Sequence, residues 1–577
     1  MKTYQWLTTL VLAACTTAVP DRSVQQDLSS IPAAWPHTTA DATEAPSAMV
    51  VTDAPLATEV GVQVMRDGGN AVDAAVAVAF ALAVVYPEAG NIGGGGFMVT
   101  RMADGTSAAL DFREKAPLAA HRDMFLDDAG ELTEASVRGH LASGVPGAVM
   151  GLWEAHRRLG TRPWAELVAP AIRLAEDGFT VDQELAASLR NYANLLRQFE
   201  GSAELFLSGG EPPAAGSRWR NPDLGRVLRR IAEDGPAGFY EGETADLIVA
   251  EMRRGGGIIT HEDLRRYRAE WRTPVEFSYR GHHIISMPPA SSGGITLAII
   301  GNILDGYPLD RLGWHTDVTL HLMAEAMRRA FADRNHYLGD PAFVEFPQAT
   351  LTSGAYAARL RETIDRDRAT PSTDVLPGMV EQPEPTHTTH FSVVDPHGNA
   401  VALTTTINGL YGSGVTIRGA GIVMNNEMDD FAAKPGSPNM FGLVQGEANA
   451  IEPEKRMLSA MTPTIVLDPA GDVLMVTGAR GGPRIITAVF QVISNVLDHG
   501  MDVATAVRAP RVHHQHLPDA LFHESSGMGA TRIGQLEAMG HTIQSRATVG
   551  TAPTILRRGS VWTAAPDPRT GGSAGGF

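Results

Sequence analysis

The stretch from Ala71 to Val85 is almost wholly apolar, and Asp73 is its only charged residue. Fifteen residues are too few to cross a bilayer as a helix, so this pattern predicts a helix that is buried on all sides. The preceding stretch, 55–67, begins with proline, has apolar residues at helical spacing, and is followed by Gly68-Gly69. This combination is typical of a helix and its end. The folded part of the chain is therefore expected to start with two helices.

Three pairs of strand-like runs lie further along the chain, and each pair is joined by a short segment of turn-forming residues. Such pairs predict antiparallel hairpins. The pairs are 97–102 with 107–112, 388–394 with 400–407, and 464–467 with 473–477.

Between residues 151 and 340 the pattern is mainly helical, with a strand-like run at 275–286. A further helix is predicted after Gly478-Ala479-Arg480-Gly481-Gly482-Pro483, to about residue 499, because proline is favoured in a first turn. The free backbone amides ahead of such a helix can face an anion. Helices combined with antiparallel strands predict a layered α+β fold.

Four consecutive glycines, Gly93 to Gly96, lie between the apolar helix and the first predicted strand. In a dinucleotide-binding fingerprint a strand leads into the glycines and a helix follows, which is the reverse order. We therefore expect no nucleotide site here. Glycines in this context predict a backbone that passes very close to another part of the chain.

Composition narrows the class of partner. The 577 residues carry 47 basic and 65 acidic side chains, a formal charge of −18, which argues against nucleic acid as the main partner. With 44% hydrophobic and 19% charged residues the chain is typical of a globular protein. A small molecule or a peptide is the expected substrate class.

The N-terminus has the pattern of an export signal. Residues 1–14 combine one lysine with a short apolar run, and Leu12-Ala13-Ala14-Cys15 is similar to a bacterial lipoprotein cleavage box. An ordinary cleaved signal with an incidental cysteine is the alternative. Residues 15–48 are rich in Ser, Thr, Pro, Asp and Ala and are predicted to be a tether. The mature protein is expected in the periplasm, with lipid on Cys15 as its only membrane contact.

A series of motifs in fixed order resembles the gamma-glutamyltranspeptidases, also called glutathione hydrolases. The similarity extends from about residue 49 to Asp567-Pro568-Arg569. The motifs lie at 67–74, 90–98, 111–114, 385–392, 425–431 and 458–464, and at Gly481-Gly482.

The resemblance implies an N-terminal-nucleophile hydrolase fold, a four-layer αββα sandwich. It also implies that the precursor cuts itself between His387 and Thr388, giving a large subunit 49–387 and a small subunit 388–577 that form one intertwined domain. The segment 371–385, rich in Pro, Glu and Thr, is predicted to be exposed and mobile, which suits a cut just after it.

A terminal threonine explains why the cut is needed. A hydroxyl is a poor nucleophile unless a base takes its proton, and a terminal amine with a pKa of about 7.7 to 8.0 can do so at neutral pH. The resemblance makes Thr388 the nucleophile, with its own amine as base, and matches Thr406 to a threonine that orients that amine. Spacing alone leaves Thr404, Thr405 and Thr406 open for this role. Gly481 and Gly482 match the oxyanion hole.

The same resemblance assigns the recognition of a γ-glutamyl group. Arg113 would bind the α-carboxylate, since a guanidinium offers bidentate geometry. Glu427 and Asp430, helped by Asn408, would bind the α-ammonium. Ser459 is the first of two serines that the family usually has, and Ala460 replaces the second, a loss of about 1 kcal/mol of carboxylate binding. Phe441 stands where many bacterial relatives have tyrosine, so a hydrogen bond that latches the lid, 434–443, is not expected.

The expected reaction is attack of Thr388 on the γ-amide of glutathione or another γ-glutamyl donor, followed by transfer of the acyl group to water, an amino acid or a peptide. Neither a metal nor a cofactor is implied. His513-His514-Gln515-His516 is a dense cluster, but adjacent histidines lack the usual metal-ligand spacing, so a structural role is expected.

Two alternatives remain. A cephalosporin or glutaryl acylase shares the fold, but its substrate lacks the ammonium that would pair Glu427 and Asp430. An uncut, noncatalytic lipoprotein that binds peptides would have no need of a terminal nucleophile.

Overall fold

The computed structural model describes residues 31–90, 92–375 and 388–577. The predicted signal 1–14, Cys15, His387 and most of the segment 371–385 lie outside these residues. Thr388 is the first described residue after the gap.

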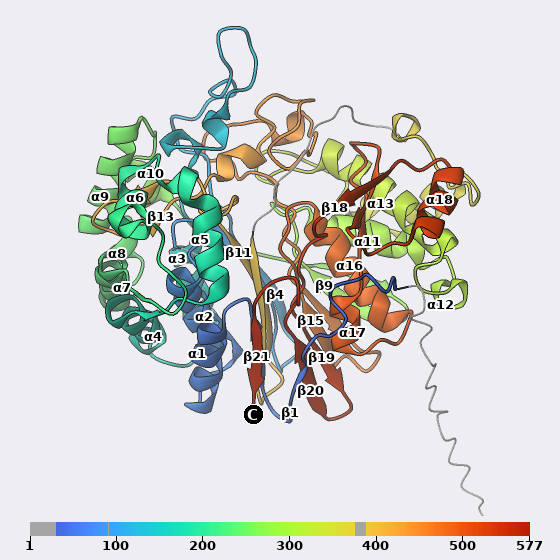
Figure 1. Ribbon diagram of the computed structural model, residues 1–577, viewed down its shortest axis with the longest axis horizontal. Coiled ribbons are helices and arrows are strands. Elements are labelled where there is room, and N and C mark those ends of the chain that lie inside the picture. The colour runs from blue at the N-terminus through green and yellow to red at the C-terminus, as the bar shows by residue number, and fades with distance from the viewer. Residues whose placement is uncertain (1–30, 91, 376–387) are drawn as a thin grey trace, which may run out of the picture.

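Two antiparallel sheets of seven strands lie face to face at the centre of the molecule (Figure 1). The first sheet has the order β21 (Ser573–Gly576), β2 (Met49–Thr52), β10 (Thr389–Val394), β11 (Ala400–Thr406), β3 (Gly95–Arg101), β4 (Ser107–Phe112) and β7 (Glu270–Arg272). The second has the order β1 (Thr43–Ala45), β20 (Val561–Ala565), β19 (Thr554–Arg558), β15 (Val473–Thr477), β14 (Thr464–Leu467), β9 (His282–Ser286) and β8 (Val275–Tyr279).

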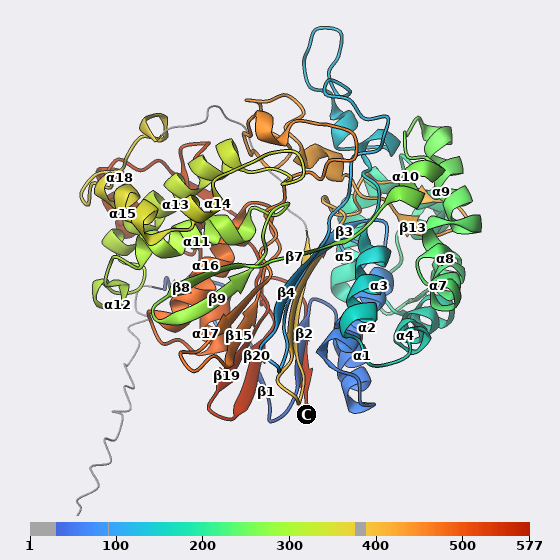
Figure 2. The ribbon, with the colours of Figure 1, turned by 180° about the vertical axis from the view of Figure 1, so that it is seen from behind.

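Helices cover the outer face of each sheet, as the front and back views both show (Figures 1 and 2). On the first sheet these include α1 (Pro55–Arg66), α2 (Ala71–Val85), α3 (Ala148–Leu159), α4 (Trp164–Asp177), α5 (Gln183–Leu196), α7 (Pro222–Asp234) and α9 (Gly242–Gly255). On the second they include α11 (Gly293–Leu304), α13 (Asp317–Tyr337), α16 (Arg484–Leu497) and α17 (Val503–Arg508). The molecule is thus the predicted αββα sandwich.

Alternating side chains on the strands of the first sheet serve two cores. Met98 packs in the cluster with α2 and its neighbours, whereas Phe97 and Val99 pack in the cluster between the sheets. Because successive side chains of a strand point to opposite faces, a strand buried on both sides must be apolar at nearly every position. The central strands β10 and β11 are buried along their whole length, which fixes their register firmly.

The predicted apolar helix is confirmed: all fifteen residues of α2 are buried. Its one charge is satisfied, since Asp73 accepts hydrogen bonds from Asn70 N at 3.0 Å and from Thr161 Oγ1 at 2.5 Å. The glycine run is also explained. A Cβ on Gly94 would lie 2.0 Å from the Thr406 carbonyl oxygen, and one on Gly96 would lie 2.4 Å from that of Thr404.

The three predicted hairpins are confirmed as β3–β4, β10–β11 and β14–β15. Two details differ. The run 275–286 is a hairpin, β8–β9, because Arg280 and Gly281 have φ of 52° and 77° and reverse the chain. Pro483 precedes α16 as its N-cap residue and so lies one position before the first turn.

The predicted tether ends too late in the sequence. Thr43–Ala45 forms β1 and pairs with β20, and Trp35 is buried, with its ring nitrogen donating to the Arg508 carbonyl at 3.1 Å. A short polar-looking segment can be ordered when it pairs with an existing sheet edge, and its composition does not reveal that edge. The ordered body therefore begins before residue 48. No helix among the described residues is long and apolar enough to cross a membrane.

Candidate active site

The predicted site residues converge on one small pocket beside Thr388, with a volume of about 20 Å³. It lies at the end of the central strands of the first sheet. Its lining includes Arg113, Thr388, Thr406, Asn408, Glu427, Asp430, Ser459, Ala460 and Gly482, together with Arg334, Phe441, Leu443, Leu458, Met461, Pro483 and Ile485. Residues more than 300 positions apart in the sequence meet here, which explains why local patterns could not have placed them together.

Thr388 immediately precedes β10 and is 5% exposed. The next residue is held by a hydrogen bond: Thr389 Oγ1 donates to Asp53 Oδ2 at 2.9 Å. Burial raises the pKa of Asp53 to about 6. The central position of β10, between β2 and β11, holds the first strand residues in a fixed register. The backbone at Thr388 is therefore presented to the pocket by a rigid scaffold.

The structure separates the three candidate threonines on β11. Thr404 shares a hydrogen bond of 2.9 Å with His390 Nδ1, and Thr405 Oγ1 donates to the Gly95 carbonyl at 2.9 Å. Thr406 alone of the three lines the pocket with Thr388, and its Oγ1 accepts from Asn408 N at 2.7 Å. The geometry thus places Thr406, and not Thr404 or Thr405, in one pocket with Thr388.

Gly481 and Gly482 lie in a tight loop before α16, with φ of 136° and 56°. These values favour glycine, since side chains strain such backbone. Arg480 fixes the loop from one side through two backbone hydrogen bonds with Thr551, of 2.9 and 3.1 Å. Neither glycine N–H donates a hydrogen bond to another described residue. Gly482 lines the pocket, so its amide is available to an oxyanion, and Gly481 lies directly before it.

Three carboxylates surround the buried guanidinium of Arg113. Its Nη1 lies 2.6 Å from Glu427 Oε2 and 3.6 Å from Glu114 Oε2, and its Nη2 donates to Asp430. Burial raises the pKa of Glu114 to about 8 and the pKa values of Glu427 and Asp430 above their ordinary range, while Arg113 opposes each shift. If all four groups are ionised, this cluster carries an excess negative charge. Such a cluster attracts a cation.

Asn408 and Ser459 complete the predicted set. Asn408 adopts a φ of 69° and donates from Nδ2 to the Asn426 carbonyl at 3.0 Å. Ser459 Oγ accepts from Met461 N at 3.1 Å, and the Ser459 carbonyl accepts from Ser292 Oγ at 2.6 Å. Ala460 lines the pocket where a second serine was expected.

Phe441 covers part of the pocket. A Cβ on Gly482 would lie 2.9 Å from its ring, and Phe441 itself is 4% exposed. Hydrogen bonds hold its segment: Met440 N donates to Asp429 Oδ2 at 2.8 Å, and Gln515 Nε2 donates to the Gly442 carbonyl at 3.2 Å. Because about 20 Å³ holds roughly one water molecule, the pocket in this state has no room for an amino-acid substrate.

Sequence reasoning missed two charged residues of the site. Glu114 ends the motif at 111–114, but the resemblance implies no role for it. Arg334 lies on the buried face of α13, three residues after Phe331 and seven after Met327. An arginine at helical spacing from large apolar residues was the available signal, because a charge on a buried face needs a reason.

The histidines of 513–516 do not share a ligand-sized space. His513 bonds Thr487 and Gln515, each at 2.9 Å, whereas His516 Nε2 lies 3.0 Å from the Ser372 carbonyl. One group in the described chain has metal-like spacing, His321, Glu325 and His541. Glu325 is already paired with Arg328 and Arg329, and two arginines beside it disfavour a cation. These donors do not fit a metal.

A threonine that immediately precedes a central strand of an αββα sandwich, and that shares a pocket with Thr406 and Gly482, is typical of the N-terminal-nucleophile hydrolases. Within that class, the family model for gamma-glutamyltranspeptidase matches residues 57–577, and the chain belongs to this family.

Similar proteins agree with this assignment. The glutathione hydrolase proenzyme of Escherichia coli K12 is 48% identical over 502 residues, covering 87% of this chain and 86% of that protein. The acylase ACY 1 proenzyme of Pseudomonas sp. SE83 is 40% identical, covering 80% and 82%. The crystal structure of a cephalosporin acylase from Bacillus halodurans superposes with a TM-score of 0.82 at 28% identity, covering 95% of this chain and 99% of that one.

Proposed function

We propose that the chain is the precursor of a glutathione hydrolase and gamma-glutamyltransferase that cuts itself before Thr388. The observation that carries this proposal is the convergence of Thr388, Thr406 and Gly482 with the charged groups Arg113, Glu427 and Asp430 in one pocket. The first three supply acyl-transfer chemistry. The last three supply the opposite charges that an α-amino acid end requires.

In the proposed reaction the free amine of Thr388 takes the proton of its own hydroxyl, and Oγ attacks the γ-carbonyl of the donor. The amides of Gly481 and Gly482 stabilise the oxyanion, where one such donor is typically worth about 2.7–4 kcal/mol. The protonated amine of Thr388 then gives its proton to the amide nitrogen of the donor, which leaves as an amine, and a γ-glutamyl ester remains on Thr388. Water or an amine of an amino acid or peptide then takes the acyl group by the same route in reverse.

The charged groups favour γ-glutamyl over glutaryl donors. A glutaryl group has no ammonium, so Glu427 and Asp430 would gain no partner on binding, and buried polar groups left unpaired cost free energy. The acylase relatives make this the second candidate function. A preference for glutaryl donors over γ-glutamyl donors would favour the acylase.

Intact-mass analysis of the purified protein, together with hydrolysis of a γ-glutamyl anilide, tests the proposal. We expect two chains whose masses fit a cut between His387 and Thr388, and activity that appears with the cut. A single uncut chain that hydrolyses the anilide would falsify the mechanism.

We further propose that residues 1–14 direct export and that Cys15 carries the lipid that anchors the enzyme in the periplasm. The support is the sequence pattern alone. Labelling of cells with a fatty acid should mark the protein, and Cys15→Ser should remove the label and release the enzyme into the soluble periplasmic fraction. Unchanged labelling in that variant would exclude Cys15 as the attachment site.

A further inference from the structure

The pocket beside Thr388 contains a second buried arginine whose charge is not balanced. Arg334 is fully buried, and it forms no ion pair with a carboxylate of the described residues. Its Nη2 has no hydrogen-bond partner there. Four other fully buried arginines contrast with it, because each contacts a carboxylate: Arg113, Arg329, Arg456 and Arg511.

A buried charge without a partner is costly, so such groups are normally paired or bind a charged ligand. The burial of Arg334 lowers its pKa to about 10, and Asp430 is the one charge that opposes the shift. The guanidinium therefore stays cationic at neutral pH, and no carboxylate of the described residues lies within ion-pair distance of it. It lines the same pocket as Thr388, so its missing partner can be a group of the substrate.

The other hydrogen bonds of Arg334 hold its guanidinium in place but do not involve Nη2. Its Nε donates to Ser292 Oγ at 3.0 Å, and Ser292 in turn donates to the Ser459 carbonyl. Its Nη1 donates to Asn335 Oδ1 at 2.9 Å and to Gln445 Oε1 at 3.3 Å. All these acceptors are neutral. They orient the guanidinium beside the Ser459-Ala460 wall without neutralising it.

Arg113, in contrast, is already surrounded by carboxylates. An α-carboxylate that approached Arg113 alone would share that single cation with Glu427 and Asp430, and like charges at such distances repel. The two opposite charges of an α-amino acid end are better accommodated when each lies beside a different charged group of the pocket. The ammonium then lies against Glu427 and Asp430, and the carboxylate reaches toward the unpaired cation.

We propose that Arg334 is a substrate-binding residue that donates to the α-carboxylate of the γ-glutamyl donor, alongside Arg113, and that it takes over the role of the hydroxyl missing at Ala460. This inference rests on the proposed function, since it names the contact of that same donor. Arg334 acts on the α-carboxylate and not on the reacting γ-carbonyl, so it sets donor specificity.

Three donors that share one γ-anilide test this contact: γ-glutamyl, 4-aminobutanoyl, which lacks only the α-carboxylate, and glutaryl, which lacks only the ammonium. We expect Arg334→Gln to lower kcat/KM for the γ-glutamyl donor by roughly tenfold or more, the size of a lost hydrogen bond to a charged group, mainly through KM. The 4-aminobutanoyl donor should be affected less than twofold. Arg334→Lys, which retains the charge, should recover part of the loss.

Arg173→Gln is the matched control, because it makes the same substitution at an exposed arginine far from the pocket. It should behave as the unchanged enzyme with every donor. Equal losses of kcat/KM for all three donors in Arg334→Gln would overturn the inference and leave Arg334 a positioning residue for the Ser459 segment.

Calorimetric binding of two product-like ligands separates this inference from the proposed function. Each variant is first shown by mass to be cut as the unchanged enzyme is. We expect the Kd of glutarate to rise roughly tenfold or more in Arg334→Gln while the Kd of 4-aminobutanoate stays the same. An unchanged Kd for glutarate overturns the role of Arg334 even if the enzyme hydrolyses γ-glutamyl donors. Absence of γ-glutamyl hydrolysis in the unchanged enzyme would refute the proposed function alone, because the binding measurement needs no turnover.

Discussion

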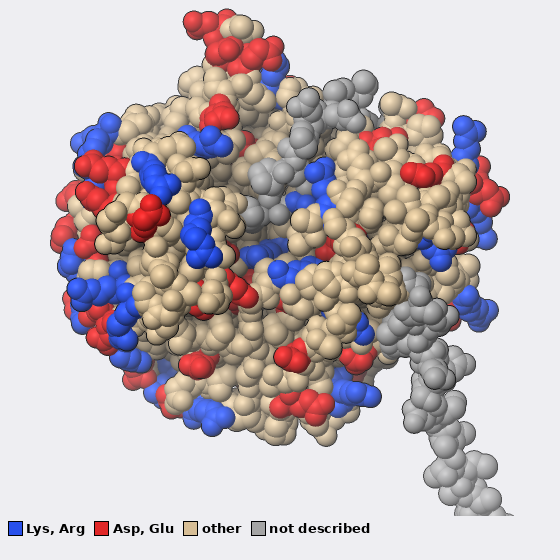
Figure 3. Space-filling view, viewed as in Figure 1, with Lys and Arg blue, Asp and Glu red and all other residues tan. Residues whose placement is uncertain are grey.

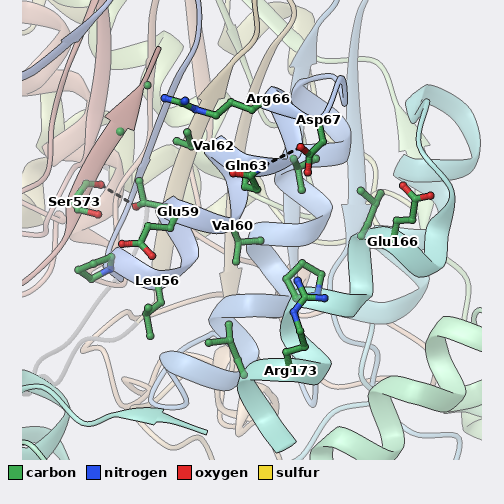
Figure 4. A pocket seen from close by; sticks show the side chains of 18 of the residues that line it. Leu56, Glu59, Val60, Val62, Gln63, Arg66, Asp67, Glu166, Arg173 and Ser573 are labelled. Carbon is green, nitrogen blue, oxygen red and sulfur yellow. Dashed lines mark hydrogen bonds between the residues drawn. The ribbon is translucent and has the colours of Figure 1, made fainter. Parts of the chain in front are cut away.

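A hollow between α1 and α4 and the pocket beside Thr388 differ in volume, exposure and charge. The hollow, which we call the α1–α4 groove, has a volume of about 1090 Å³ and is lined by α1, α4 and β21. Figure 4 shows Glu59, Arg66, Asp67, Glu166 and Arg173 standing separately around it. The Thr388 pocket is about fifty times smaller, yet its charges are buried and unbalanced.

The contrast shows that volume alone does not identify the site. In the groove, acidic and basic side chains are solvated and compensate one another, as they do over much of the face in Figure 3. An exposed ion pair such as Arg162 with Glu166, at 2.5 Å, costs little to form or to lose. In the pocket, burial makes each uncompensated charge expensive, and a ligand of opposite charge can recover that cost.

The first prediction compares a substitution of the proposed nucleophile, Thr388, with a substitution in the α1–α4 groove. Thr388→Ala should abolish both the cut and γ-glutamyl hydrolysis, because neither step has a hydroxyl to attack with. Glu59→Gln, an exposed groove substitution, should leave both unchanged. Intact mass and anilide hydrolysis measure the two effects. A cut or active Thr388→Ala protein would mean that another residue is the nucleophile.

The second prediction compares the two kinds of arginine. Arg113→Gln should lower the free energy of unfolding by about 3–5 kcal/mol, since it leaves Glu114, Glu427 and Asp430 buried without their cation. Arg162→Gln should lower it by about 0–1 kcal/mol. Urea unfolding of both variants in the uncut Thr388→Ala background, which can refold as one chain, gives the difference. Similar losses would contradict the contrast between pocket and groove.

The third prediction concerns pH. The pKa of Glu114 is raised from 4.5 to about 8, so between these values the folded state holds a proton that the unfolded state releases. The contribution of Glu114 to the free energy of unfolding should therefore fall as the pH rises from about 4.5 to 8. Glu114→Gln should remove this contribution, measured as the difference between urea unfolding at pH 5 and at pH 8 in the uncut Thr388→Ala background. Glu59→Gln in the same background measures the effect of losing one exposed carboxylate. An equally steep fall in Glu114→Gln would show that other groups cause it.

The smallest expected effect is at Ala460. Ala460→Ser should add one hydroxyl to the wall of the pocket beside Ser459 and lower KM for γ-glutamyl donors by up to about fivefold, the worth of about one hydrogen bond. Steady-state kinetics at constant enzyme concentration test this. The Kd of 4-aminobutanoate, which has no α-carboxylate, should not change, and a parallel change in that Kd would argue against a carboxylate contact.

The sequence predicted the fold well where local patterns and family motifs coincide. The fifteen residues of α2 and the three hairpins followed from hydrophobic period and turn chemistry. The glycine run predicted a close backbone approach but not that β11 is the strand it approaches. Thr388, Arg113 and Asp430 came from motifs and lie in one pocket. The predicted start of the ordered body was wrong, because β1 is ordered by pairing with β20, which lies more than 500 residues later in the sequence.

The charge balance of the pocket could not be predicted in the same way. Whether a given arginine is neutralised depends on residues from several distant segments. Arg334 on α13 is oriented by Ser292 and Gln445, whereas Arg113 receives its carboxylates from its neighbour Glu114 and from a loop some 315 positions later. The order of these residues in the sequence does not indicate which of them are in contact in the folded protein.

The central position of β10 and β11 has a consequence for how the enzyme can unfold and refold after its proposed cut. Both strands would belong to the small subunit, yet they lie between β2 and β3 of the large subunit, while β1 of the large subunit pairs with β20 of the small one. The two subunits therefore could not dissociate without breaking the strand pairing in both sheets. An uncut chain can refold by itself, whereas a cut one must find its lost half again, so its recovery from denaturant would depend on dilution. Each mature molecule would in effect fold only once.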